Sequence, residues 1–355
     1  MPSTPYTHTP PLSGPRFTLP PGREATRPPE ARGLARDEVR LLVARPDRLV
    51  DARFRDLGAH LRPGDLVVVN TSATLPAAVD ATWRDGTDLV VHVAGPSPEG
   101  GLVVELRRTD GLGPHLDAQV GEVVQLASGT RLTLRAPHVG GPDGGTRLWQ
   151  AQRDRVGPWE EELRRHGRPI RYGYLDGAWP LASYQTVFGR TPGSAEMASA
   201  GRPFRDATVT DLVTRGVLVA PVTLHTGVSS QEAHEPPPAE RFEVPPVTAA
   251  AVDHVRRTGG RIVAVGTTVT RALESAAAPG GQVRATGGWT DLVLGPDRPA
   301  RVVTGLVTGW HAPEASHLQL LEAVAGAPLV QAAYDAAVGR GYRWHEFGDS
   351  CLLLP

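Results

Sequence analysis

The sequence contains no lysine, a single cysteine and no long apolar run. Cys351 alone excludes an internal disulfide and a zinc site built from several cysteines, and in its apolar tail we expect a small packed side chain. No run of about eighteen apolar residues suggests a membrane span, and the N-terminus lacks a basic and then apolar signal. We therefore expect a cytoplasmic protein without a membrane partner.

The charge balance gives no support for a nucleic-acid partner. Arginine supplies all 37 basic side chains other than histidine, against 38 acidic ones, for a net charge of -1. Proteins that hold nucleic acid usually carry a basic face, and this chain has no global excess to form one. The 355 residues are 40% hydrophobic and 21% charged, as in an ordinary globular chain that is long enough for two domains.

Several motif classes are missing. No Gly-x-Gly-x-x-Gly turn follows a strand, no lysine is available for a phosphate-binding loop, and no His-Glu-x-x-His helix occurs. The histidines show no spacing typical of metal ligands, so we assign no metal.

The stretch from Gly260 to Ser275 predicts a strand, a tight turn and a helix. Ile262 to Val265 is an apolar, β-branched run that predicts a buried strand, and Gly266 ends it. Residues 269–278 favour a helix. In such units the turn lies at the carboxyl end of the strand, where open α/β sheets bind ligands. Thr267 and Thr268 lie at this position, either as part of a site or as helix caps.

The rest of the chain predicts an α/β main domain with an inserted small β-barrel domain. Residues 1–16 are rich in Pro, Thr and Ser, and we expect a disordered N-terminal tail. Residues 17–78 and 150–355 form the discontinuous α/β domain. Residues 79–149 alternate apolar and polar positions between glycine turns, which indicates the barrel. Its expected strands cover residues 89–93, 102–106, 122–126 and 130–134.

Two further positions are candidates from the residues alone. His225 follows the apolar run 217–224 and precedes Gly227, so it lies at the carboxyl end of a predicted central strand. Tyr184 and Gln185 lie near a glycine-rich loop, where they either contact a flat base or pack and cap.

Together these motifs resemble the S-adenosylmethionine:tRNA ribosyltransferase-isomerase family of the queuosine pathway. The resemblance extends from about Phe17 to Leu354 and is strongest between Gly259 and Asp291. The segments that carry it share the family's residue order: Gly266-Thr267-Thr268 with Arg271 and Glu274, Gly288-Trp289-Thr290-Asp291, Thr223-Leu224-His225 with Gly227, Tyr184-Gln185-Thr186-Val187, and Trp310-His311 with Pro313.

The resemblance implies an enzyme that uses S-adenosylmethionine as co-substrate. It would move the ribosyl part to 7-aminomethyl-7-deazaguanine in tRNA, giving an epoxycyclopentane ring with release of adenine and methionine. His225 and His311 are the expected proton carriers, because imidazole works near neutral pH. Glu274 and Asp291 are expected to balance the sulfonium or bind ribose hydroxyls. The expected substrate-binding residues are Thr267, Thr268 and Arg271 for the methionine carboxylate, with Trp289, Tyr184, Gln185, Ser199 and Gly227.

The chain departs from the family at several charged positions. Ala73 and Ala78 stand where the family has arginines, Pro203 where it has a histidine, and Glu314 where it has a lysine; Ser199 takes a threonine place. Lost basic side chains weaken the expectation that tRNA is the partner. Two alternatives therefore stay open: a paralogue that uses the same donor on a small-molecule acceptor, and a non-catalytic binder of S-adenosylmethionine or of a partner.

Overall fold

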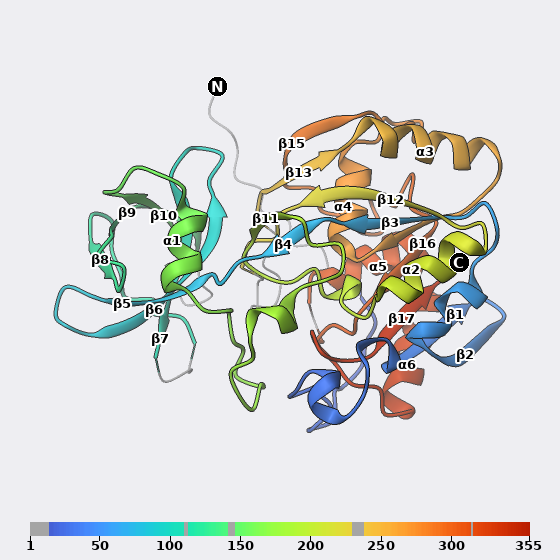
Figure 1. The fold of residues 1–355 in the computed structure, drawn as a ribbon, viewed down its shortest axis with the longest axis horizontal. Coiled ribbons are helices and arrows are strands. Elements are labelled where there is room, and N and C mark those ends of the chain that lie inside the picture. Colours follow the sequence, from blue (N-terminus) through green and yellow to red (C-terminus); the bar gives the residue numbers. More distant parts are fainter. Residues whose placement is uncertain (1–13, 110–112, 141–145, 229–237, 314) are drawn as a thin grey trace.

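The computed structural model describes residues 14–109, 113–140, 146–228, 238–313 and 315–355 (Figure 1). Most of the expected N-terminal tail lies outside these ranges, as does Glu314. Residue 16 is attached to the fold, because the backbone N–H of Arg16 donates to Gln331 Oε1 at 2.8 Å. None of the helices in these ranges is long and apolar enough to span a membrane.

A nine-stranded mixed sheet forms the centre of the main domain. Its order is β15, β13, β12, β3, β14, β16, β17, β1, β2. The strands run over Thr286–Thr290, Glu240–Val244, Leu218–Leu224, Leu66–Asn70, Ile262–Val265, Gly305–Thr308, Ser350–Leu353, Arg40–Arg45 and Arg48–Arg53. The four central strands β12, β3, β14 and β16 are mutually parallel, so their carboxyl ends lie at one edge.

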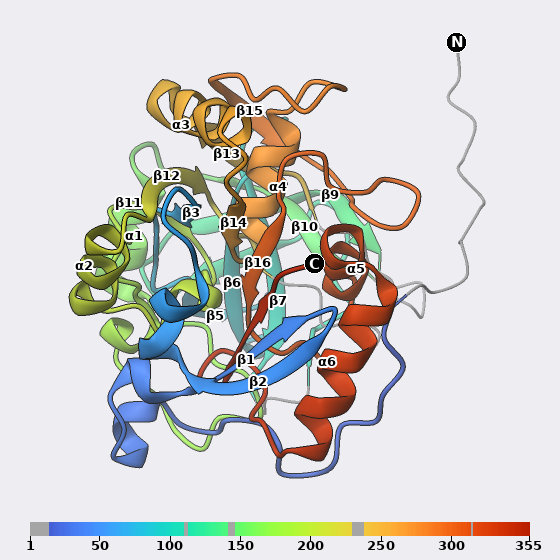
Figure 2. The ribbon, with the colours of Figure 1, turned by 90° about the vertical axis from the view of Figure 1, so that its right-hand side faces the viewer.

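Both faces of this sheet are covered, which explains its apolar runs. In β3, Leu66 and Val68 pack into one core while Val67 and Val69 pack into the other, as the two-residue period of a strand requires. Helices α3 (Pro246–Arg257), α4 (Thr267–Ser275), α5 (His317–Ala325) and α6 (Ala327–Gly339) contribute to the first core. Helix α2 (Asp206–Thr214) and the 3-10 helix η3 (Phe54–His60) cover the other face (Figure 2).

The inserted domain is a closed six-stranded barrel, as the alternating pattern predicted. Its order is β10, β7, β6, β5, β8, β9. The strands run over Thr146–Arg153, Leu102–Arg108, Asp88–Pro96, Ala78–Thr82, Val123–Leu126 and Arg131–Gly140. Helix α1 (Trp159–His166) packs on the barrel through Leu163 and Trp159.

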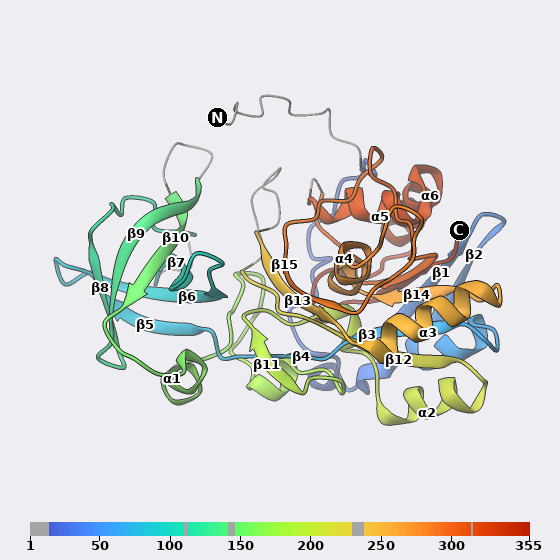
Figure 3. The ribbon, with the colours of Figure 1, turned by 90° about the horizontal axis from the view of Figure 1, so that it is seen from above.

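A short two-stranded parallel sheet connects the two domains. Strand β4 (Ser72–Thr74) leads from β3 toward the barrel, and β11 (Thr191–Ser194) pairs with it on the return path. Figure 3 shows this pair between the barrel and the main sheet. The passage between the domains is therefore only a few residues from the edge where the central strands end.

Candidate active site

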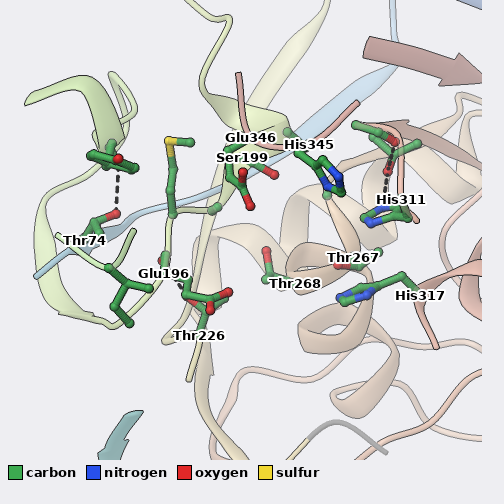
Figure 4. Close-up of a pocket in the computed structure, with 18 of the residues that line it drawn as sticks. Thr74, Glu196, Ser199, Thr226, Thr267, Thr268, His311, His317, His345 and Glu346 are labelled. Carbon is green, nitrogen blue, oxygen red and sulfur yellow. Dashed lines mark hydrogen bonds between the residues drawn. The ribbon is translucent and has the colours of Figure 1, made fainter. Parts of the chain in front are cut away.

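A polar cavity lies at the edge where the parallel strands of the main sheet end (Figure 4). Thr226 follows β12, Gly266 follows β14, and Thr308 ends β16. Ligands in open α/β sheets bind at this edge because the loops that follow the strands converge there. The remaining walls come from the connecting segments and the C-terminal turn, with side chains from Thr74, Ile170, Tyr172, Tyr184, Glu196, Met197, Ser199, Trp310, His311, His317, His345 and Glu346.

The N-terminus of α4 opens into this cavity. Gly266 is the N-cap with a φ of 92°, and no side chain caps the helix, so neither threonine acts as the cap. Thr267 and Thr268 line the cavity. The first N–H groups of a helix lack intrahelical partners and carry a partial positive charge. This end of the cavity therefore suits a carboxylate.

His311, His317 and His345 line the cavity, and burial lowers the pKa of each, so these imidazoles are neutral near pH 7. His311 and His317 stack with ring centroids 4.8 Å apart. The Thr308 hydroxyl donates to the Gly309 carbonyl, so His311 Nε2–H donates to Thr308 Oγ1 at 3.1 Å and leaves Nδ1 as an acceptor. Burial lowers the pKa of His311 far below its ordinary value, and burial with the charge of Arg271 lowers that of His317 to about 4.

No role was predicted for His317, which lies six residues from His311; within one helix that spacing would place the two rings on different faces. His311 lies in the loop before α5, and His317 is the first residue of that helix. The helical spacing argument does not apply across this boundary. The sequence signal for His317 was its place at the start of α5, the helix that follows the end of β16.

Two tyrosine and glutamate pairs lie at the cavity, and Tyr172, Glu196 and Glu346 of these pairs line it. Tyr172 donates to Glu196, and Tyr174 donates to Glu346. His345 stacks on Tyr174 at 4.4 Å. Burial raises the pKa of Glu346 to about 7 against the hydrogen bond from Tyr174, and the nearby charge of Glu196 raises it further. The sequence reasoning assigned none of these residues, because they come from three distant, non-periodic segments.

His225 does not line the same cavity as His311. It lines a neighbouring cavity at the barrel side, together with Trp159, Trp289 and Arg241. The Thr226 N–H donates to Ser194 Oγ at 3.0 Å, Ser194 and Ser72 hydroxyls lie 2.5 Å apart, and Ser72 Oγ lies 2.8 Å from His225 Nδ1. When Ser194 donates to Ser72 and Ser72 to His225, every one of these protons has an acceptor. His225 then keeps its proton on Nε2.

Burial, and then the charge of Arg241, lowers the pKa of His225. Both predicted proton carriers are therefore neutral imidazoles in separate cavities. A third cavity adjoins the other two and shares Thr267, Thr268 and Gly227 with one or the other of them.

Arg271 and Glu274, three residues apart in α4, have different partners. Arg271 lines the third cavity and forms its ion pair with Glu240 of β13. Glu274 is only 1% exposed, and its carboxylate accepts backbone N–H groups of residues 301–303 at 2.8 to 3.0 Å. It lines none of the three cavities, so its carboxylate holds the loop before β16 rather than facing a ligand.

The other predicted residues divide between cavity and surface. Tyr184 and Ser199 line the main cavity, and Trp289, 38% exposed, lines the one beside His225. Gln185 bonds the backbone N–H and carbonyl of Thr74 at 3.1 and 2.7 Å, which fixes β4. Asp291 is exposed and outside the cavities. In the described ranges no three His, Cys, Asp or Glu side chains are grouped to hold a metal ion.

The chain thus combines a closed barrel with an α/β domain that has a polar cavity at the carboxyl edge of its parallel strands. The chain matches the family described as queuosine biosynthesis protein over residues 12–353. It belongs to this family.

Several known proteins are similar to this chain over almost their whole length. A protein of Moorella thermoacetica named S-adenosylmethionine:tRNA ribosyltransferase-isomerase is 33% identical, with 95% of this chain and 98% of that protein covered. A protein of Thermus thermophilus with the same name is 36% identical, with 95% of this chain and 98% of that protein covered. The crystal structure of an S-adenosylmethionine tRNA ribosyltransferase from Thermotoga maritima is 30% identical, with a TM-score of 0.52 and coverage of 95% and 99%.

Proposed function

We propose that this chain transfers the ribosyl part of S-adenosylmethionine to 7-aminomethyl-7-deazaguanine in a tRNA and isomerises it to an epoxycyclopentane, releasing adenine and methionine. The observation that carries the proposal is the α4 N-terminus, with Thr267 and Thr268, opening into one cavity with three histidines and two glutamates. This occurs in a chain aligned with its named relatives over 95% of its length. A tRNA acceptor makes the cytoplasm the expected location.

The two sides of the cavity suit different parts of this reaction. The α4 N-terminus binds the methionine carboxylate together with Thr267 and Thr268. No side chain caps this helix, so its first backbone N–H groups are available to a ligand. Neutral His311 offers Nδ1 as an acceptor, and the stacked His317 ring extends a flat surface for the leaving adenine. Tyr184 provides a buried ring beside the acidic side.

A second candidate keeps the donor and replaces tRNA with a small acceptor. It is favoured by Ala73 and Ala78, which lie in the passage between the domains and take the places of two arginines. Each guanidinium group at these positions would bind two phosphate oxygens at once. A gel shift with tRNA at rising salt separates the candidates, since phosphate contacts weaken steeply with salt.

Adenine release tests the proposed reaction itself. Purified protein is incubated with S-adenosylmethionine and with tRNA that carries the aminomethyl base, tRNA that carries guanine, or no tRNA. We expect adenine only with the aminomethyl base. Adenine in the presence of small amines and not of this tRNA would favour the second candidate.

A further inference from the structure

The glutamate and tyrosine side of the main cavity is held in place by an unusual backbone turn. His345 has a φ of 70° and is the one non-glycine residue with positive φ in the described ranges. This conformation is unfavourable for a residue with a side chain and persists where surrounding contacts enforce it. Here the Gly348 N–H donates to the His345 carbonyl at 2.9 Å, and the His345 N–H donates to the Trp310 carbonyl.

This turn places Glu346 at the cavity. Tyr174 donates its hydroxyl to the Glu346 carboxylate and lies in a stack between the Tyr172 ring at 5.7 Å and the His345 ring at 4.4 Å. The stack fixes the direction of the Tyr174 hydroxyl, and a carboxylate has lone pairs for further hydrogen bonds beside the one from Tyr174. Figure 4 shows Glu346 beside His345 in the cavity wall.

Burial shifts the pKa of the histidines and the pKa of Glu346 in this cavity in opposite directions. It lowers the pKa of His311, His317 and His345, so these imidazoles are weak bases. It raises the pKa of Glu346 to about 7. A general base works best with a pKa near the operating pH. The carboxylate, rather than a histidine, therefore has the proton affinity that removal of a proton at neutral pH requires.

We propose that Glu346 takes the proton from the ammonium group of the acceptor. The inference rests on the proposed function. An aminomethyl group is an ammonium ion near neutral pH, and its nitrogen must lose one proton before its lone pair can attack the ribosyl carbon. The N–H bond breaks, its electron pair stays on nitrogen, and the proton forms an O–H bond with the Glu346 carboxylate.

The groups around Glu346 suit a cation at this position. The titratable groups that face it are Glu196, Tyr172, Tyr174, Tyr184 and His345, which come from four separate segments of the chain. Glu196 adds a second carboxyl group. None of these five is a permanent cation.

Glu346→Gln tests the inference, because glutamine keeps the size and can still accept from Tyr174 but cannot take a proton. We expect kcat to fall about 100-fold or more and the acid limb of its pH profile to disappear. The affinity for S-adenosylmethionine, measured by calorimetry, should change less than about threefold. Glu243→Gln is the matched control, since Glu243 is an exposed residue outside the cavities, and it should keep kcat and pH profile.

Two further measurements separate this inference from the proposed function. Acetate should restore turnover to Glu346→Ala by supplying a carboxylate. Without any turnover, the native protein should bind free 7-aminomethyl-7-deazaguanine at least about tenfold more tightly than the uncharged 7-cyano analogue, and Glu346→Gln should lose this preference. Native protein that is inactive on tRNA yet shows this preference would refute the proposed function alone.

The inference is overturned if Glu346→Gln keeps the native kcat and pH profile, or if the preference for the charged base is absent or survives the substitution. It is also overturned if the variant instead stops deuterium exchange at the ribose carbon next to sulfur of S-adenosylmethionine. In that case Glu346 would act on the donor carbon.

Discussion

The guanidinium of Arg271 in α4 forms an ion pair with the carboxylate of Glu240 in β13, and both side chains are largely buried. Burial raises the pKa of Glu240 in spite of this partner. Arg271 also donates to the Thr290 and Leu292 carbonyls at 3.0 and 3.1 Å. One side chain thus joins α4 to the edge of the sheet beside the third cavity.

Glu240→Ala should lower the free energy of unfolding by about 3 to 5 kcal/mol, because it leaves a buried guanidinium without its counter-charge. The comparison variant is Glu161→Ala, which removes an exposed pair with Arg165 and should cost at most about 0.5 kcal/mol. Urea unfolding followed by circular dichroism measures both. An equal loss of unfolding free energy in the two variants would contradict a larger contribution of the buried pair.

Glu274→Gln should destabilise the fold by about 2 to 3 kcal/mol, since an amide accepts the three backbone N–H groups less well than a carboxylate. If the residue instead acted on substrate, kcat would fall while the unfolding midpoint stayed in place. Thermal unfolding and adenine release on the same preparation distinguish the two roles.

Gly193→Ala should disturb His225, because the added Cβ would lie 2.4 Å from its Nδ1. We expect loss of the Ser72 hydrogen bond and, if His225 takes part in the reaction, a fall in kcat of about tenfold or more. Gly280→Ala is the control, as its Cβ would meet no atom within 4 Å. Native activity in Gly193→Ala would count against a role for His225.

The structure also predicts how stability falls on acidification. The folded pKa of His317, about 4, lies below the unfolded value of 6.5, so the unfolded chain binds more protons between these pH values. Stability should therefore drop as pH falls through this window, by at most about 3 kcal/mol for this residue. His317→Gln should reduce the drop between pH 7 and 5 measured by urea unfolding. Exposed His254→Gln should not.

The contribution of Glu346 to stability depends on pH in the opposite direction. Its folded pKa, about 7, lies above the unfolded value of 4.5, so the folded state keeps a proton that the unfolded chain releases as pH rises. Glu346→Gln should stabilise the protein above pH 7 by at most about 3 kcal/mol, and leave it unchanged below pH 4.5. Destabilisation of Glu346→Gln at pH 8 would contradict the raised pKa.

Sequence patterns were sufficient for the fold where side-chain burial follows a period. The run of Ile262 to Val265 between glycines gave the bounds of β14, since a strand buried on both faces needs uninterrupted apolar residues. The alternating runs identified β6 to β9 of the barrel for the same kind of reason.

The candidate site could be predicted only in part. Thr267, Thr268 and His311 follow strands directly, so strand prediction placed them at the correct edge. Glu196 and Glu346 could not be found this way, because their segments have no period and meet only through tertiary packing. The pKa shifts of His317 and Glu346 could not be predicted either, because burial causes them and the sequence does not give burial in loops.

The most direct test of the account is adenine release from S-adenosylmethionine by the native protein, with tRNA carrying 7-aminomethyl-7-deazaguanine and with the same tRNA carrying guanine. The account predicts adenine with the first tRNA and none with the second. No adenine with either tRNA, in protein that binds S-adenosylmethionine by calorimetry, would contradict it.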